Sequence, residues 1–225
     1  MKIMKFIREK LYQWITKIDT PIFVNSYGRS GSTVLSNAIL KSAIPGDNFL
    51  STKISRGGKI GAWELDSINP TQGFLYKTHD YPQQNINHCN LRMLYTFADP
   101  VDVVLSLLRL FETKGESWMK EHYQHLNAKY GDFPKIIYED QLGLEKHLNA
   151  WLNEERFPIA FIRYETMWKC QDDISDFLGF AVELPPYRKR QAANFNDATI
   201  LESIKETYQP LQKKINTLDD FFVLN

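Results

Sequence analysis

Short apolar runs alternate along the chain with longer segments whose apolar residues recur at helical spacing. The runs predict buried strands, and the longer segments predict helices. Strands are expected at residues 21–25, 73–78, 91–98 and 157–164. Helices are expected at residues 31–42, 101–111, 116–129, 139–155 and 166–178. This alternation predicts a single α/β domain over residues 1–225, with a central, mostly parallel sheet flanked by helices.

Two further segments depart from that alternation. Residues 45–72 are rich in glycine and proline, which predicts loops. Residues 1–19 form an amphipathic helix, with Phe6, Leu11 and Trp14 near helical spacing and lysines between them. Peripheral contact with a membrane surface, or with a partner, is one interpretation of this helix. Packing on the domain is the other, and it is favoured because amphipathic helices commonly cover a core.

Composition and charge narrow the function classes. The chain has 225 residues, of which 43% are hydrophobic and 24% charged, typical of a globular protein. The 27 basic and 27 acidic residues balance, so a nucleic-acid partner is not expected. No apolar run is long enough to suggest a transmembrane segment. Cys89 and Cys170 have no metal-binding or redox spacing, which favours a reducing, cytoplasmic location.

The junction between the first strand and the first helix has the composition of an anion-binding loop. Its sequence is Tyr27-Gly28-Arg29-Ser30-Gly31-Ser32-Thr33. A helix N-terminus presents N–H groups that bind anions, and Gly28 and Gly31 let the backbone approach them. Ser30, Ser32 and Thr33 add hydroxyl groups, and Arg29 adds a planar cation suited to phosphate or sulfate.

A lysine and a histidine follow the second strand. Lys77 and His79 are two residues apart, so on an extended segment they point to the same side. The carboxyl ends of parallel strands face the ligand crevice of such sheets. A cation beside a histidine suits a reaction that needs charge stabilisation and a proton acceptor.

The helix after the third strand carries a polar pair on an otherwise apolar segment. Ser106 and Arg109 are three residues apart and share one face, from which they can reach a second phosphate. His122 and His125 lie further along and are interpreted as surface residues or as lining of an acceptor pocket. The sequence shows no cluster of metal ligands, so no metal is expected.

Taken together, these elements resemble the sulfotransferases that use 3′-phosphoadenosine 5′-phosphosulfate (PAPS). Residues 28–33 are similar to the family loop [PG][KR]SG[ST]T, and Lys77-Thr78-His79 to its KTH element. Residues 98–106 are similar to its RxPxDxxxS element, and Tyr164-Glu165 to its YE element. The matches occur in family order and imply the P-loop-NTPase-like sulfotransferase fold.

The resemblance also implies roles for these residues in in-line sulfuryl transfer to a hydroxyl or amine. Arg29 and the amides of residues 30–33 would hold the 5′-phosphosulfate, and Lys77 would steady the transferring group. His79 would be the general base, with Glu64 in reserve. Ser106 would bind the 3′-phosphate, also in the desulfated product adenosine 3′,5′-bisphosphate (PAP), and Tyr164 would contact adenine.

The sequence departs from the family at three positions. Ala98 stands where the family has the arginine of its 3′-phosphate element, and Arg109 or the run Arg188-Lys189-Arg190 is the expected replacement. Val34 stands where cytosolic members carry a tryptophan against adenine. Arg29 stands where lysine is usual, a variation of carbohydrate-type members. A small molecule or a carbohydrate is therefore the expected acceptor.

Two other functions remain open at this point. A P-loop kinase is suggested by the apolar run ending in Asp99, although the motif GxxxxGK[ST] is missing. A non-catalytic binding protein on a degenerate sulfotransferase scaffold is suggested by Ala98. Binding of PAP without metal, compared with binding of ATP–Mg²⁺, discriminates between these readings.

Overall fold

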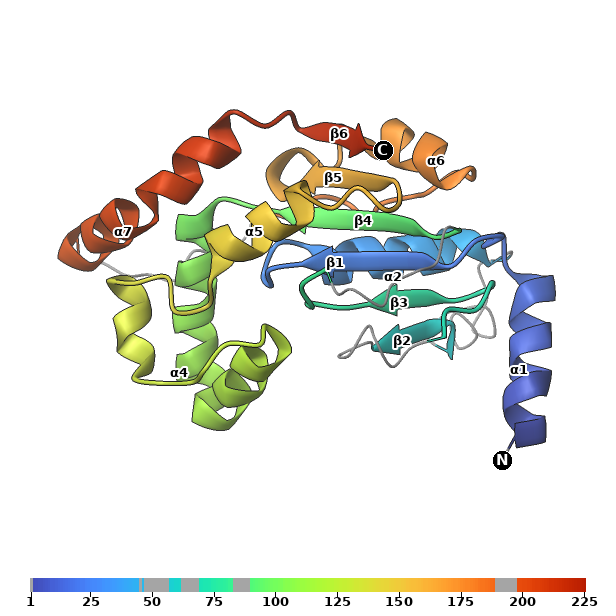
Figure 1. Ribbon diagram of the computed structural model, residues 1–225, viewed down its shortest axis with the longest axis horizontal. Coiled ribbons are helices and arrows are strands. Elements are labelled where there is room, and N and C mark those ends of the chain that lie inside the picture. Colours follow the sequence, from blue (N-terminus) through green and yellow to red (C-terminus); the bar gives the residue numbers. More distant parts are fainter. Residues whose placement is uncertain (1, 45, 47–56, 62–68, 83–89, 189–197) are drawn as a thin grey trace.

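The strands form one sheet, as the sequence predicts. The computed structural model describes residues 2–44, 46, 57–61, 69–82, 90–188 and 198–225. Its six strands lie in the order β2-β3-β1-β4-β5-β6 (Figure 1). They are β1 (Ile22–Ser26), β2 (Lys59–Gly61), β3 (Leu75–Lys77), β4 (Arg92–Phe97), β5 (Ile159–Arg163) and β6 (Phe221–Leu224). Every neighbouring pair is parallel except β5 and β6, so the expected mostly parallel sheet is confirmed.

Helices surround this sheet (Figure 1). The α-helices are α1 (Lys2–Ile15), α2 (Ser32–Ala43), α4 (Pro100–His125), α5 (Leu144–Leu152), α6 (Gln171–Leu178) and α7 (Ala198–Asn216). Two 3-10 turns, η2 (Phe133–Ile137) and η3 (Tyr164–Thr166), complete the description. None of these helices is long and apolar enough, over the residues described, to cross a bilayer.

The register of the sheet brings three strand ends to one level. Val24 of β1 lies opposite Lys77 of β3 and opposite Leu94 of β4. The chain leaves β1 into the 27–31 loop, leaves β3 toward His79 and leaves β4 into α4. Because these strands are parallel, all three segments meet at one edge of the sheet.

Several predicted helix boundaries are wrong, each for a local reason. The helices expected at 101–111 and 116–129 form the single element α4, which breaks at Gly115 (φ 78°, ψ −176°) and ends at His125. The helix expected at 139–155 is shorter and corresponds to α5, Leu144–Leu152. It begins at Leu144 because the Asp140 carboxylate accepts hydrogen bonds from the N–H groups of Leu144 and Glu145 at the helix start. The helix expected at 166–178 begins only at Gln171.

The C-terminal segment adds a helix and an edge strand to the elements expected above. Apolar residues of α7 recur at helical spacing and are buried, at Ile204, Tyr208, Leu211 and Ile215, so local spacing was a usable signal for this helix. The Arg163 guanidinium donates to the carbonyls of Ile215 and Leu218 at 2.6 and 2.8 Å, which ties the end of α7 to β5. The Phe222 ring of β6 stacks on Phe161 of β5 at 4.8 Å, and this pairing depends on a partner distant in sequence.

The N-terminal helix packs on the domain through one side only. Tyr12 is buried and stacks on Phe74 at a centroid distance of 4.8 Å. Leu11 and Trp14, which the packing interpretation would bury, are exposed. The favoured interpretation of residues 1–19 therefore holds for the Tyr12 side and is wrong for the apolar face that suggested it.

A buried tyrosine joins the loop after β1 to the end of β4. The Tyr27 hydroxyl donates to the Ala98 carbonyl at 2.5 Å and accepts from the Ala98 N–H at 2.7 Å. Both residues are fully buried. The hydroxyl therefore satisfies two backbone groups that water cannot reach.

We expect Tyr27→Phe to lower the free energy of unfolding by about 1–3 kcal/mol, because it leaves the Ala98 N–H and C=O buried without a partner. Urea denaturation followed by circular dichroism measures this change. Tyr138→Phe, at an exposed tyrosine, is the matched control and should leave stability unchanged. Equal stability of the wild type and Tyr27→Phe would contradict the prediction.

Candidate active site

The loop between β1 and α2 curls through three left-handed residues. Gly28, Arg29 and Gly31 have φ angles of 86°, 54° and 87°. The first hydrogen bond of α2 runs from the Leu35 N–H to the Gly31 carbonyl at 3.1 Å. The N–H groups of residues 32–34 precede that bond and stand at the positive end of the helix. This is the backbone geometry of an anion-binding nest.

Two aromatic rings press on the glycines of this loop. A Cβ atom on Gly31 would lie 2.1 Å from Tyr164 Cδ2, and one on Gly28 would lie 2.7 Å from His122 Cε1. Both glycines are therefore required by the positive φ angle and by the close approach. The rings hold the loop from both sides in its curled form.

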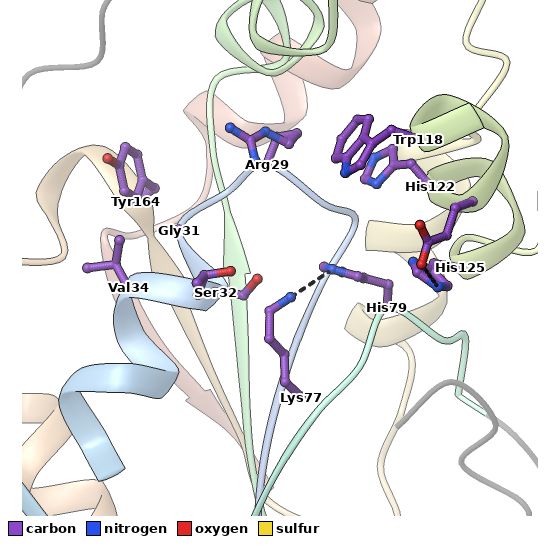
Figure 2. Close-up of a pocket in the computed structure, with 12 residues that line it drawn as sticks. Arg29, Gly31, Ser32, Val34, Lys77, His79, Trp118, His122, His125 and Tyr164 are labelled. Carbon is purple, nitrogen blue, oxygen red and sulfur yellow. Dashed lines mark hydrogen bonds and ion pairs between the residues drawn. The ribbon is translucent and has the colours of Figure 1, made fainter. Parts of the chain in front are cut away.

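The lysine that ends β3 and the histidine two residues later contact each other. Lys77 Nζ lies 3.2 Å from His79 Nε2, and His79 Nδ1 lies 2.7 Å from the Ser26 carbonyl oxygen. A carbonyl only accepts, so Nδ1 carries the proton and Nε2 presents its lone pair toward Lys77. Figure 2 shows both side chains pointing into the same space below the loop.

Buried hydrogen bonds fix the backbone around His79. His147 Nε2 donates to the His79 carbonyl at 2.9 Å, and His147 Nδ1 accepts from the Tyr95 hydroxyl at 2.8 Å. The next carbonyl, that of Asp80, accepts from Asn25 Nδ2 and Trp151 Nε1, both at 2.9 Å. These donors come from β1, β4 and α5, so the orientation of His79 depends on three separate elements.

Burial and neighbouring cations set the protonation states. Burial lowers the pKa of Lys77 to about 8, and the positive charges of Lys59 and Arg29 add to this effect. Burial also lowers the pKa of His79 well below its usual range, with the Lys77 charge as the next cause. At neutral pH the site therefore pairs a charged ammonium with a neutral imidazole.

The second half of α4 forms the opposite wall. The Trp118 ring stacks on His122 with a centroid distance of 5.1 Å and an interplanar angle of 10°. His122 is buried, its Nε2 has no hydrogen-bond partner among the described residues, and burial lowers its pKa to about 3. His125 lies one turn nearer the helix end, 3.8 Å from the Glu121 carboxylate.

These elements enclose a cavity of about 410 Å³ (Figure 2). Its lining combines the loop, the Lys77–His79 pair and the α4 wall. The lining residues are Arg29, Gly31, Ser32, Thr33, Val34, Lys77, His79, Trp118, Glu121, His122, His125 and Tyr164. One side offers backbone N–H groups and cations, and the other offers aromatic and imidazole surfaces.

Most of the residues expected from the loop, KTH and YE elements line this cavity, but Gly28 and Ser30 do not. The Ser30 hydroxyl is buried and donates to the Thr96 carbonyl at 2.8 Å, so it ties the loop to β4. Arg29 Nε donates to Ser106 Oγ at 3.0 Å, which joins the loop to α4 just outside the lining.

Only some of the residues expected to replace the missing arginine lie in the described part of the chain. Arg109 lies on α4 one turn beyond Ser106 and is exposed. Arg188 is exposed, whereas Lys189 and Arg190 lie outside the described residues, as does Glu64. Within the described ranges, no group of three or more His, Cys, Asp or Glu side chains is arranged to hold a metal ion.

Sequence reasoning missed the residues that act at a distance from the loop. His147 belongs to a segment with no recognisable motif, and Tyr27 opens the loop but gave no sign of its bond to Ala98, so only the fold shows what these two residues do. The pairing of Trp118 with His122 at spacing i, i+4 was a usable signal, because such residues share one helix face.

Comparisons with known proteins add distant similarities. No protein-family model and no curated protein matches the sequence. The mouse sulfotransferase SULT7A1 complexed with PAP matches at 17% identity and TM-score 0.37, covering 95% of this chain and 72% of that one. Retinol dehydratase in complex with androsterone and the inactive cofactor PAP matches at 17% identity and TM-score 0.49, covering 94% of this chain and 86% of that one. Retinol dehydratase in complex with retinol and PAP matches at 18% identity and TM-score 0.44, covering 93% of this chain and 69% of that one.

The buried histidines predict a dependence of stability on pH. Burial lowers the pKa of His122 to about 3 and that of His147 to about 4, against about 6.5 in an unfolded chain. As pH falls below about 6.5, the unfolded state binds protons that the folded state does not. Each histidine should then lower the free energy of unfolding by about 1.4 kcal/mol per pH unit until its folded pKa is reached.

His122→Phe isolates one of these contributions, because phenylalanine keeps a flat ring against Trp118 and removes the unpartnered Nε2. Urea denaturation at a series of pH values between about 6 and 4.5 gives the free energy of unfolding as a function of pH. The slope of this plot should correspond to the uptake of one proton fewer on unfolding than in the wild type. Identical slopes would show that His122 is protonated in the folded protein and would contradict the assignment.

Proposed function

We propose that this protein is a sulfotransferase that moves a sulfuryl group from PAPS to a hydroxyl or amine acceptor by in-line transfer. The observation that carries the proposal is the Lys77 Nζ–His79 Nε2 contact of 3.2 Å beside the anion-binding loop, in one cavity. A cation for the transferring group and a proton acceptor for the attacking group thus lie together. The resemblance of the loop, KTH and YE elements to the PAPS-dependent family agrees with this geometry.

The loop fits the phosphosulfate end of the donor. The N–H groups at the start of α2 and the hydroxyls of Ser32 and Thr33 supply donors for its oxygens. Arg29 adds a cation in the same lining, held by Ser106. Tyr164, packed on Gly31, offers an aromatic surface for the adenine. Bound there, PAPS would supply the sulfuryl group.

Lys77 and His79 perform the chemical roles. Transfer of this kind develops charge on the peripheral and leaving oxygens, and the Lys77 ammonium stabilises that charge. His79 Nε2 takes the acceptor proton, because its Nδ1 proton is committed to the Ser26 carbonyl. When an anion pairs with Lys77, the charge of this lysine no longer disfavours a proton on His79, so donor binding strengthens the base.

The 3′-phosphate lacks the family arginine in this chain. The position is occupied by Ala98, whose backbone is bonded to Tyr27 and whose side chain is buried. We propose that Ser106 and Arg109 on α4, with the run Arg188-Lys189-Arg190, supply the contacts instead. A small molecule or carbohydrate would bind as acceptor against the Trp118–His122 wall.

The kinase alternative is less compatible with the site. Its metal-binding candidate, Asp99, uses its carboxylate to cap α4, accepting from the N–H groups of Val101 and Asp102 at 2.8 and 3.2 Å. The non-catalytic alternative predicts that PAP binds weakly or not at all.

Calorimetric titration with PAP in the presence of EDTA tests the donor site. We expect PAP to bind more tightly than AMP and without metal. Arg29→Ala should weaken binding about 10- to 100-fold, because a charge-assisted hydrogen bond to the anion is lost. Lys205→Ala, at an exposed lysine of α7, is the control and should bind normally. Binding of ATP–Mg²⁺ in place of PAP would overturn the proposal in favour of a kinase. No binding of PAP, AMP or ATP–Mg²⁺ would favour the non-catalytic scaffold.

Sulfate transfer from labelled PAPS to a panel of phenols, alcohols and sugars tests the base. With an acceptor that the wild type uses, His79→Ala should lower kcat about 10²- to 10⁴-fold while PAP affinity changes little. Activity should also fall above about pH 8, because Lys77 in the free protein then loses its charge. Unchanged kcat in His79→Ala would remove His79 as the base.

A further inference from the structure

The outer face of α1 exposes four large apolar side chains. Phe6 is 59% exposed, Ile7 55%, Leu11 47% and Trp14 83%. At about 100° per residue they fall within roughly 140° of the helix circumference, so they form one face. Apolar side chains clustered on an exposed face indicate a surface that contacts something apolar.

The opposite face of α1 fixes this orientation. Tyr12 is 6% exposed and stacks on Phe74, and the Arg8 guanidinium donates to the Gly57 carbonyl at 2.5 Å. A Cβ atom on Gly73 would lie 2.7 Å from the Tyr12 backbone, so the helix sits directly on the chain before β3. The helix cannot turn its apolar face inward without breaking these contacts.

Cations accompany the apolar face. The Lys10 ammonium lies 5.8 Å from the centroid of the Phe6 ring, and Lys17 is exposed just beyond the helix end. Residues 1–19 contain five basic and two acidic residues, whereas the whole chain has a net charge of zero. The basic excess is therefore concentrated in the segment that carries the exposed apolar face.

We propose that α1 binds the surface of an anionic lipid membrane, lying in the plane of the interface. Phe6, Ile7, Leu11 and Trp14 would enter the headgroup–acyl boundary, while Lys10 and Lys17 pair with anionic headgroups. With 14 residues, α1 is about 21 Å long, shorter than the roughly 30 Å hydrocarbon core, which fits a surface position. A protein partner would satisfy the apolar face but would not call for the basic excess around an exposed tryptophan.

The membrane surface and the cavity lie at opposite ends of the sheet. In Figure 1, α1 stands at the right, and α4 stands at the left beyond the carboxyl ends of the parallel strands. The Ile18 carbonyl accepts from the Gly73 N–H at 3.0 Å, just before β3, so the end of α1 adjoins the amino ends of the strands. A protein held through α1 keeps its cavity turned toward water.

Cosedimentation of the full chain with vesicles tests the proposal. We expect binding to phosphatidylcholine vesicles that contain phosphatidylserine, much weaker binding to pure phosphatidylcholine, and loss of binding as salt is raised. Trp14→Ser with Ile7→Ser should lower the partition coefficient at least about tenfold. Lys10→Gln with Lys17→Gln should lower it about fivefold for each charge removed.

Two controls separate lipid binding from other effects. Tyr138→Ser removes a 65% exposed aromatic residue outside α1 and should leave the partition coefficient unchanged. All four substituted positions are exposed, so their variants should unfold at the same urea concentration as the wild type. The Trp14 fluorescence should shift to shorter wavelength with anionic vesicles, and the shift should vanish in Trp14→Phe.

Three results would overturn the proposal. The first is no binding of the wild type to anionic vesicles, and the second is binding that survives both double variants. The third is concentration-dependent self-association in sedimentation velocity that Trp14→Ser with Ile7→Ser abolishes, without vesicle binding, because α1 would then pair two copies of the chain. PAP binding is unaffected by these variants in every case, so failure here is distinct from failure of the proposed function.

Discussion

The hydrogen bond from His79 Nδ1 to the Ser26 carbonyl joins the end of β1 to the turn after β3 and settles the tautomer of the imidazole. Nδ1 is the donor, so Nε2 must present a lone pair, which it directs toward Lys77 Nζ. The Ser26 hydroxyl extends the same junction, since it lies 3.1 Å from both His79 Nδ1 and Ser32 Oγ at the start of α2. One junction thus fixes the orientation of His79 and the start of α2.

Close packing around this junction holds the polar groups of the loop in place. Tyr164 and His122 press on the loop through Gly31 and Gly28, and Ser30 and Tyr27 tie it to β4. The loop therefore holds its left-handed conformation before any ligand arrives, and binding does not have to supply the ordering free energy. The cost is the burial of ionisable side chains, seen in the lowered pKa values of Lys77 and the histidines.

The same electrostatics link binding to chemistry. Burial, and after it the charges of Arg29 and Lys77, lowers the pKa of His122, and burial, followed by the charge of Lys77, lowers that of His79. Under the proposed function, an anion bound at the loop would offset the Lys77 charge, so the His79 imidazole would become a better base when PAPS is present. At the other end of the sheet, α1 carries its own charge and apolar face, separated from the cavity by the length of the strands (Figure 1). The two ends can therefore engage different partners without competing.

The sequence by itself determined the parallel α/β sheet and the anion-binding loop, because apolar periodicity and the Gly-Arg-Ser-Gly-Ser-Thr run are local signals. It also placed Lys77 and His79 on one side of a strand end, since their spacing follows from the pleat alone. Only the tertiary structure decided that Ser30 is structural, that His147 supports His79, and that β6 extends the sheet beside β5. It also decided that Phe6 and Trp14 face outward. Each of these outcomes depends on which distant residue competes for a hydrogen bond or for buried area, and local spacing carries no information about distant partners.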